Sequence, residues 1–162
     1  MQVADKPIVG VIFGSESDRE VMAAAGEYLD RFGIPYEVHV MSAHRNPERT
    51  ARYAKEAAGR GLKVLIAGAG MAAHLGGVVA SHTNLPVIGV PLPGSSLLGL
   101  DSLLSTVQMP AGVPVATMAI GKAGARNAAI FTVRLLALAD PVIAERLERF
   151  SAELQSGVGG AV

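Results

Sequence analysis

The chain has 162 residues, a length typical of one domain. Its 14 basic and 14 acidic side chains cancel, which argues against a nucleic-acid partner, because DNA and RNA bind basic surfaces. It has no cysteine, so disulfide bonds and thiolate chemistry are excluded.

The first residues, MQVADKPIVGV, do not contain a charged segment followed by a long apolar one. No secretion signal is therefore predicted. Because the lack of cysteine is also compatible with a reducing compartment, we expect a cytoplasmic protein.

The middle of the chain is unusually poor in charge, with Asp101 as the only formally charged residue between Val64 and Gly121. Glycine, proline, serine and threonine interrupt this segment, and no stretch of about 20 residues is continuously apolar, so no membrane span is expected. Surfaces of monomers are normally rich in charge. We therefore predict a homo-oligomer that buries part of the segment between subunits.

The first predicted strand is the apolar run 8–13, which is too continuous for a strand with one exposed face and so indicates a buried parallel strand. The segment GSESD follows at 14–18, and apolar residues then recur at helical spacing until Gly33 ends the helix. A second strand is predicted at 36–40, and a second helix at 47–60 begins with a proline, which suits a first turn.

The third strand is predicted at 63–67, and the loop 68–71 is expected to open a third helix that ends near His82. The fourth strand is predicted at 86–90, and the loop PLPGSS at 91–96 follows it.

A short helix is predicted at 100–107, and a fifth strand at 113–120, whose Pro114 favours the start of the strand or an edge position. Two helices complete the chain, at 125–139 and from Asp140 to about Gln155. We expect the remaining residues, 156–162, to form a flexible tail.

Strands and helices alternate five times without a linker, which predicts an α/β fold with an open, doubly wound parallel sheet in a single domain over residues 1–155. Ligands of such sheets bind beyond the carboxyl ends of the strands, where the strand order reverses. The loops after the first three strands are therefore the candidate site.

In the first loop, Gly14 would let the backbone approach a ligand closely. Ser15 or Ser17 could cap the following helix, and the free amides there favour an anion. Asp18 suits the first turn of a helix. Taken alone, this loop is better explained as a simple helix cap, because caps of this kind are common.

In the second loop, SAHRNP, Arg45 offers a planar fork for a phosphate or carboxylate. His44 is the side chain type with an unperturbed pKa near neutral pH, which suits a proton carrier. The alternative is a surface His-Arg pair before a helix.

The third loop, residues 68–77, is rich in glycine and alanine and would form a tight apolar wall with exposed amides, including Gly70 and Met71. His74, taken alone, suits a structural histidine on a helix face, and His39 and His82 are interpreted as structural or solvated. Without HExxH or cysteine partners, the four histidines do not predict a metal site.

Two other site types for this fold are disfavoured. A phosphoacceptor domain would need an acidic cluster after the first strand and an acceptor aspartate after the third, and only Lys122 after the fifth strand fits. A flavin site would need stacking aromatic side chains, and these loops have none. A phosphorylated small molecule handled by proton transfer remains.

The chain from about Ile8 to Ala139 resembles the PurE family, the N5-carboxyaminoimidazole ribonucleotide mutases of purine biosynthesis. The resemblance is carried by GSxSD, SAHRxP, AGxGxAAHL, DSLLSxVQMPxGxPVAT and GKAGARNAA, in this order. The forms SAHR and AAHL resemble the bacterial mutase class rather than animal-type carboxylases. Met71 stands where the mutases usually have a second glycine, and Gly76 where many have proline.

The resemblance implies a flavodoxin-like, three-layer fold, a homo-octamer with its site near subunit contacts, a ribonucleotide substrate, and no metal or organic cofactor. It implies decarboxylation to a bound ribotide and trapped CO2, followed by attack of ring carbon C4. His44 would carry the proton. The expected substrate contacts are Ser15, Ser42 and Arg45 to the phosphate and Asp18 to the ribose, with Gly14, Ser17, Gly70, Met71 and His74 beside them.

Two alternatives stay open at this point. The same residues could support direct carboxylation of aminoimidazole ribonucleotide by free CO2. A non-catalytic, flavodoxin-like nucleotide-binding module would bind a ribotide without turnover and would leave His44 without a chemical role.

Overall fold

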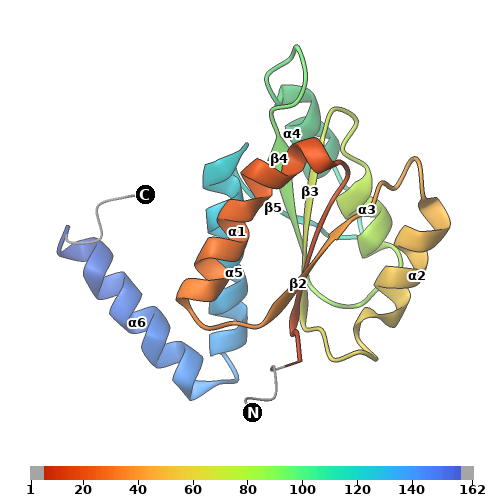
Figure 1. Cartoon of the computed structure of the whole chain (residues 1–162). Helices are drawn as coiled ribbons and strands as arrows, with labels where there is room; N and C mark the ends of the chain where they lie inside the picture. The colour runs from red at the N-terminus through yellow and green to blue at the C-terminus, as the bar shows by residue number, and fades with distance from the viewer. Residues whose placement is uncertain (1–5, 158–162) are drawn as a thin grey trace.

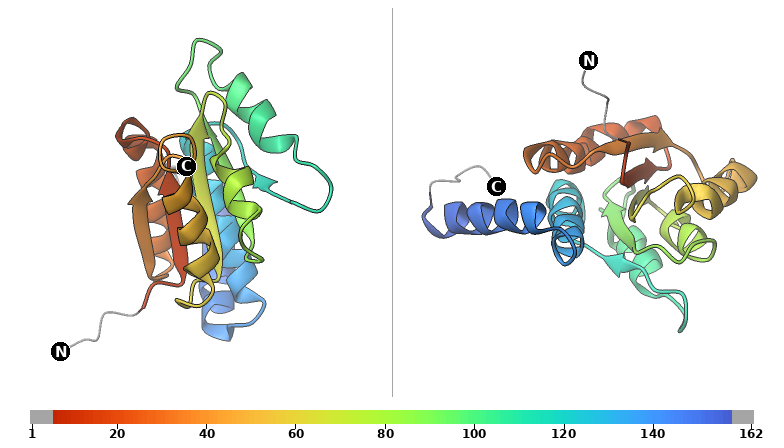
Figure 2. Two further views of the ribbon diagram at one scale, coloured as in Figure 1. Left: turned by 90° about the vertical axis from the view of Figure 1, so that its right-hand side faces the viewer. Right: turned by 90° about the horizontal axis from the view of Figure 1, so that it is seen from below.

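The computed structural model describes residues 6–157, which form one parallel sheet covered by helices on both faces (Figures 1 and 2). The elements in chain order are β1 (Val9–Phe13), a 3₁₀ turn (Glu16–Asp18), α1 (Arg19–Arg31), β2 (Tyr36–Val40), α2 (Pro47–Ala57), β3 (Val64–Gly70), α3 (Leu75–Ala80), β4 (Val87–Leu92), α4 (Leu100–Val107), β5 (Ala116–Thr117), α5 (Lys122–Ala137) and α6 (Pro141–Gln155).

The strand order is β2-β1-β3-β4-β5, and every pair is parallel. The chain therefore reverses its direction of winding at β1 and β3, as in flavodoxin-like folds. This confirms the predicted doubly wound α/β architecture. It also confirms the position of β5 at an edge, which the proline at 114 had suggested.

Two hydrophobic clusters give the fold its three layers. One lies between the sheet and α1, α5 and α6 and includes Phe13, Met22 and Phe150. The other lies between the sheet and α2 and α3 and includes Ile12 and Tyr53. Side chains of successive strand residues point to opposite faces, so the continuous apolar runs of the central strands supply both clusters.

Several predicted boundaries were wrong, mostly in the segments that surround the site. The third strand does not end at 67 but continues to Gly70, because β4 pairs along its whole length and Gly70 lies opposite Leu92. The third helix consequently begins at Leu75 and ends at Ala80, before His82. β4 likewise runs through Pro91 to Leu92 rather than ending at 90.

The remaining differences lie at helix ends and at the sheet edge. The second helix ends at Ala57 rather than at 60, and α5 spans Lys122–Ala137 rather than 125–139. The fifth strand was predicted over eight positions but only Ala116 and Thr117 pair, because one neighbour is available at the edge.

The last helix, α6, begins as predicted at Pro141, with Asp140 accepting hydrogen bonds from the amides of Val142 and Ile143. Arg146 of this helix donates to the carbonyl oxygen of Phe32 at 2.6 Å and so ties α6 to the end of α1. Of the expected tail, Ser156 and Gly157 follow α6 as a turn, and the rest lies outside the described residues.

Candidate active site

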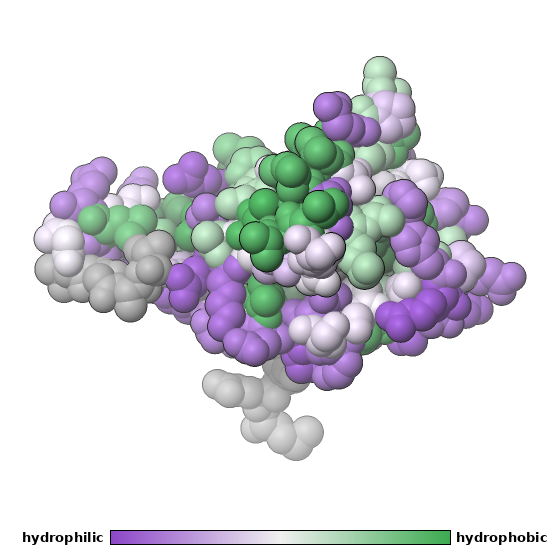
Figure 3. Space-filling view, turned by 90° about the horizontal axis from the view of Figure 1, so that it is seen from above, coloured by the Kyte–Doolittle hydropathy of each residue, from purple (hydrophilic) through white to green (hydrophobic). Residues whose placement is uncertain are grey.

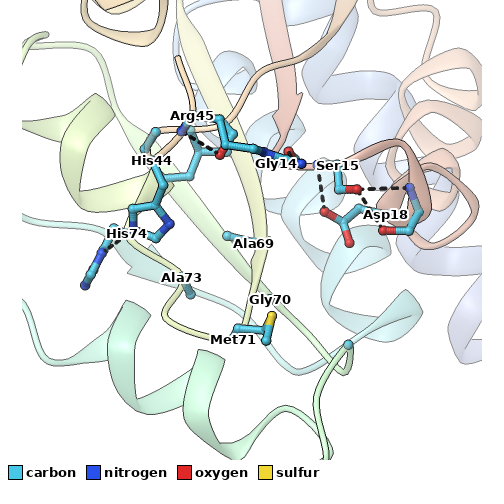
Figure 4. Close-up of a pocket in the computed structure, with 15 residues that line it drawn as sticks. Gly14, Ser15, Asp18, His44, Arg45, Ala69, Gly70, Met71, Ala73 and His74 are labelled. Carbon is cyan, nitrogen blue, oxygen red and sulfur yellow. Dashed lines mark hydrogen bonds between the residues drawn. The ribbon is translucent and has the colours of Figure 1, made fainter. Parts of the chain in front are cut away.

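A pocket of about 440 Å³ lies beyond the carboxyl ends of β1, β2 and β3 (Figure 4). The loops after these three strands supply almost all of its lining, as the strand order predicts. The lining residues are Gly14, Ser15, Ser17, Asp18, Ser42, Ala43, His44, Arg45, Ala69, Gly70, Met71, Ala73, His74, Leu75 and Gly94.

The first loop is held by hydrogen bonds of its own side chains. Asp18 Oδ2 accepts from the backbone amide of Ser15 at 3.0 Å, and Ser15 Oγ accepts from the Ser17 hydroxyl at 2.9 Å. Together with the amide of Ser17, these contacts form a capping box around the 3₁₀ turn. The predicted capping role is therefore present, and it leaves the two hydroxyl groups at the pocket wall.

Asp18 carries a shifted pKa within this loop. Burial raises the pKa of its carboxyl group, while the amide of Ser15 and the positive charge of Arg45 act in the opposite direction. Because Arg45 comes from the second loop, the charge of Asp18 depends on the packing of the two loops against each other.

The second loop turns tightly between β2 and α2. The amide of Asn46 donates to the carbonyl of Ser42 at 2.8 Å, and the amide of Arg45 donates to Ser42 Oγ at 3.3 Å. The Arg45 guanidinium reaches across and donates through Nη2 to the carbonyl oxygen of Gly14 at 2.7 Å. The cation is thereby fixed beside the first loop, and its side chain is still exposed to solvent.

The two pocket histidines face each other. His44 Nε2 lies 2.6 Å from His74 Nδ1, and the rings meet edge to face with their centroids 4.8 Å apart. One nitrogen must donate and the other accept, so the pair holds a single hydrogen between the two rings. Two coupled imidazoles at the wall of a pocket are suited to take up and return a proton.

The third loop begins with a tight turn rather than a helix. The amide of Ala73 donates to the carbonyl of Gly70 at 3.0 Å, and Met71 and Ala73 both have positive φ angles, 54° and 29°. Ala69, Ala73 and Leu75 are buried and give the pocket an apolar wall, whereas Met71 is 62% exposed. The predicted wall of small residues is present, but the amide of Ala73 is used to close the turn and does not face the pocket as a free donor.

All ten residues proposed from the sequence line this pocket. His74, which taken alone suited a structural role, immediately precedes α3 and contacts His44. The structure adds Ala43, Ala69, Ala73, Leu75 and Gly94. Gly94 could have been found from the PLPGSS loop, because β4 lies next to β3 and its carboxyl end reaches the same edge of the sheet.

Within residues 6–157, no group of three or more histidine, aspartate or glutamate side chains is arranged to hold a metal ion. No helix in this part of the chain has both the length and the apolar character needed to cross a membrane.

The AIR carboxylase family matches residues 8–156. An N5-carboxyaminoimidazole ribonucleotide mutase of Pyrococcus horikoshii is 54% identical over 96% of this chain and 86% of that protein. One of Pseudomonas aeruginosa is 58% identical over 90% of this chain and 89% of that protein. The crystal structure of Treponema denticola PurE superposes with a TM-score of 0.85 at 28% identity, covering 94% of both chains.

Proposed function

Because the chain belongs to the AIR carboxylase family, we propose that the pocket beyond β1, β2 and β3 is its active site. The enzyme is an N5-carboxyaminoimidazole ribonucleotide mutase of purine biosynthesis, and hence an isomerase. The observation that carries the site assignment is the contact between His44 Nε2 and His74 Nδ1, 2.6 Å apart, with Arg45 next to His44 in the second loop. We also propose that the enzyme acts in the cytoplasm.

The reaction moves a carboxyl group from the exocyclic nitrogen of the ribotide to ring carbon C4. We propose that the nitrogen–carbon bond breaks first, leaving its electron pair on nitrogen, which takes one proton as CO2 departs. C4 then supplies the electron pair for the new carbon–carbon bond, and the hydrogen on C4 leaves as a proton. One proton is consumed and one released, so a single acid–base group balances both steps.

His44 is the proposed acid–base group. Its ring lines the pocket and contacts His74, which can share the additional positive charge while His44 holds the proton. The shared hydrogen also fixes the orientation of the His44 ring before substrate enters, which reduces the loss of entropy in the proton transfer step.

The phosphate and the ribose are proposed to bind to the first and second loops. Arg45 supplies a charged fork, and Ser15 and Ser42, from the first and second loops, line the same pocket. Asp18 is proposed to accept from the ribose hydroxyls. Binding energy at this end fixes the imidazole ring near the reacting carboxyl group.

The apolar third loop is proposed to hold CO2. A carbamate loses its charge as it fragments, so a less polar surrounding favours this step. Ala69, Ala73 and Leu75 supply buried apolar surface beside His74. No metal or organic cofactor has a role in this scheme.

We also propose that the enzyme acts as a homo-oligomer, the octamer that the family resemblance implies. Large apolar side chains are exposed on α4 and the loop before it, namely Leu97, Leu98, Leu100, Leu104 and Val107, here called the α4 patch. Figure 3 shows apolar surface gathered over this end of the molecule. The α4 patch lies within the charge-poor segment, and exposed apolar patches of this kind mark contact surfaces.

The decisive test is turnover of N5-carboxyaminoimidazole ribonucleotide by the purified enzyme in bicarbonate that carries an isotope label. A mutase gives product that keeps the original, unlabelled carboxyl group. Direct carboxylation of the ribotide would instead place label in the product. Binding without product would contradict the enzyme assignment altogether.

A further inference from the structure

Met71 occupies a backbone position that favours glycine. The turn from Gly70 to Ala73 is closed by a hydrogen bond of 3.0 Å, and of its two central residues only the first, Met71, has a positive φ. A turn in which the first central residue alone has a positive φ is a type II′ turn, and glycine is preferred at that position. A methionine there strains the backbone, because its Cβ crowds the neighbouring carbonyl group.

Within the single chain, packing of the Met71 side chain does not compensate this strain. That side chain is 62% exposed, whereas Ala73, the other strained residue of the loop, is 3% exposed and packs in the core. Leu98 is also exposed and strained, but it belongs to the α4 patch and does not line the pocket. Strain kept at a pocket wall points to a contact that forms only with ligand.

Met71 stands where such a contact can form. It follows β3 directly, lines the pocket, and lies three positions before His74. Figure 4 shows Met71 along the lower edge of the pocket, with Gly14 and Ser15 along the upper edge. A flexible, polarisable thioether adapts to irregular surfaces and packs well against aromatic rings.

We propose that Met71 is a substrate-covering residue: its side chain packs over the bound imidazole ring and closes the exit for CO2 between the two half-reactions. CO2 carries no charge and forms only weak hydrogen bonds, so enclosure by apolar groups is the means by which a site can retain it. This inference rests on the proposed mutase function and assigns a residue that, in this chain, contributes to keeping the carboxyl group in the pocket.

The experiment compares Met71→Gly, Met71→Ala and Met71→Leu with the unaltered enzyme. Each is given substrate with a ¹³C-labelled carboxyl group in unlabelled bicarbonate, and the label retained in the product is measured. Met71→Gly and Met71→Ala should retain less label and release more free ribotide, by at least roughly twofold. Met71→Leu, which keeps an apolar side chain of similar size, should retain more label than either.

Thermal unfolding distinguishes the covering role of the Met71 side chain from the backbone strain at this position. Met71→Gly removes both, so its Tm should rise by roughly 2 to 4 °C while its label retention falls. Met71→Ala keeps most of the strain and should show no such rise. If both small variants make product and retain as much label as the unaltered enzyme, the covering role is wrong and the mutase function stands. If the unaltered enzyme makes no product, the proposed function itself fails.

Discussion

His44 and His74 meet at the pocket wall, although they are 30 residues apart in the chain, with 2.6 Å between Nε2 of the first and Nδ1 of the second. One of these two nitrogens must donate and the other accept, so a single hydrogen lies between the two rings. In the proposed mechanism the two residues act together as one proton-carrying unit, so each is expected to lose part of its function when the other is replaced.

Replacement of His44 should remove turnover and spare substrate binding. For His44→Ala we expect kcat to fall by about 10²- to 10⁴-fold, the usual contribution of a general acid–base group, with a dissociation constant for the ribotide close to that of the unaltered enzyme. Steady-state kinetics and calorimetric titration measure the two quantities. A variant that keeps most of its kcat would show that another group carries the proton.

Replacement of His74 should have a smaller and graded effect. His74→Phe removes the hydrogen bond to His44 and keeps a ring, so kcat should fall more than in His74→Asn, which can still form a hydrogen bond. Neither should reach the loss seen for His44→Ala. If His74→Phe turned over at the unaltered rate, His74 would have only the structural role that its sequence context first suggested.

Replacement of Arg45 should act on binding. Hydrogen bonds to a charged group are worth about 1.5 to 3 kcal/mol, so Arg45→Ala should raise KM by roughly tenfold or more. Arg45→Lys keeps the charge without the planar fork, so its KM should lie between those of the unaltered enzyme and Arg45→Ala. The kinetics should be compared at several salt concentrations, and an unchanged KM would contradict the phosphate assignment.

The raised pKa of Asp18 predicts how its replacement changes stability with pH. Burial favours the protonated form in the folded state, so the ionised carboxylate opposes folding once the pH exceeds this raised pKa. Asp18→Asn, which can still accept from the amide of Ser15, should increase the free energy of unfolding at neutral pH. The gain should shrink as the pH is lowered toward 3.8, the ordinary pKa of the group.

Urea unfolding at a series of pH values measures this difference, and kinetics measure its functional counterpart. The same variant should raise KM, because an amide is a weaker acceptor for ribose hydroxyls than a carboxylate. A constant stability difference at every pH would show that the charge of Asp18 is not its cause.

A close approach in the core gives a prediction for stability. A Cβ atom added at Gly10 would lie 2.3 Å from Oη of Tyr53 and 2.8 Å from a methyl group of Leu65. Tyr53 is fixed there because its hydroxyl donates to Glu37 at 2.8 Å, and burial with the nearby carboxylate raises the pKa of Tyr53 and keeps it protonated. Gly10→Ala should therefore destabilise the protein by about 1 to 3 kcal/mol.

A double-mutant cycle isolates this contact. In the background of Tyr53→Phe, which lacks the hydroxyl, Gly10→Ala should cost clearly less than in the unaltered protein. Denaturant unfolding of the four proteins gives the coupling free energy. A coupling free energy of zero would mean that the methyl group of Leu65, rather than the Tyr53 hydroxyl, causes the clash with a side chain at Gly10.

The α4 patch predicts the site of self-association. Leu104→Glu places a charge within the patch and should shift the enzyme toward smaller species in light scattering. Leu138→Glu is the matched control, since Leu138 is 86% exposed and lies between α5 and α6, away from the patch. A particle of unchanged mass for Leu104→Glu would remove the α4 patch from the proposed contact.

Much of the fold could be predicted because the central strands are apolar on both faces and each helix has a clear beginning or end. The errors in the strands share one cause, which is strand pairing. Gly68 to Gly70 have the composition of a loop, yet they extend β3 because β4 lies beside them. Residues 113–120 have the composition of a strand, yet most do not pair, because they lie at an edge.

The residues that line the pocket could be named because parallel strands bring their following loops to one edge of the sheet. The contacts among them could not be named. Nothing in the local sequence of His44 points to His74, and the positive φ of Met71 contradicts local preference. Both features involve the third loop, between β3 and α3, whose conformation local preference does not specify.

The strand order has a last consequence for how activity arises. β1 lies between β2 and β3, whose following loops carry the two histidines, so the pairing of all three strands fixes the spacing at which the imidazole rings meet. A nascent or partly unfolded chain in which these strands are not yet paired does not fix this spacing for the proposed proton carrier. The rate at which turnover recovers during refolding would therefore report when β2, β1 and β3 have paired.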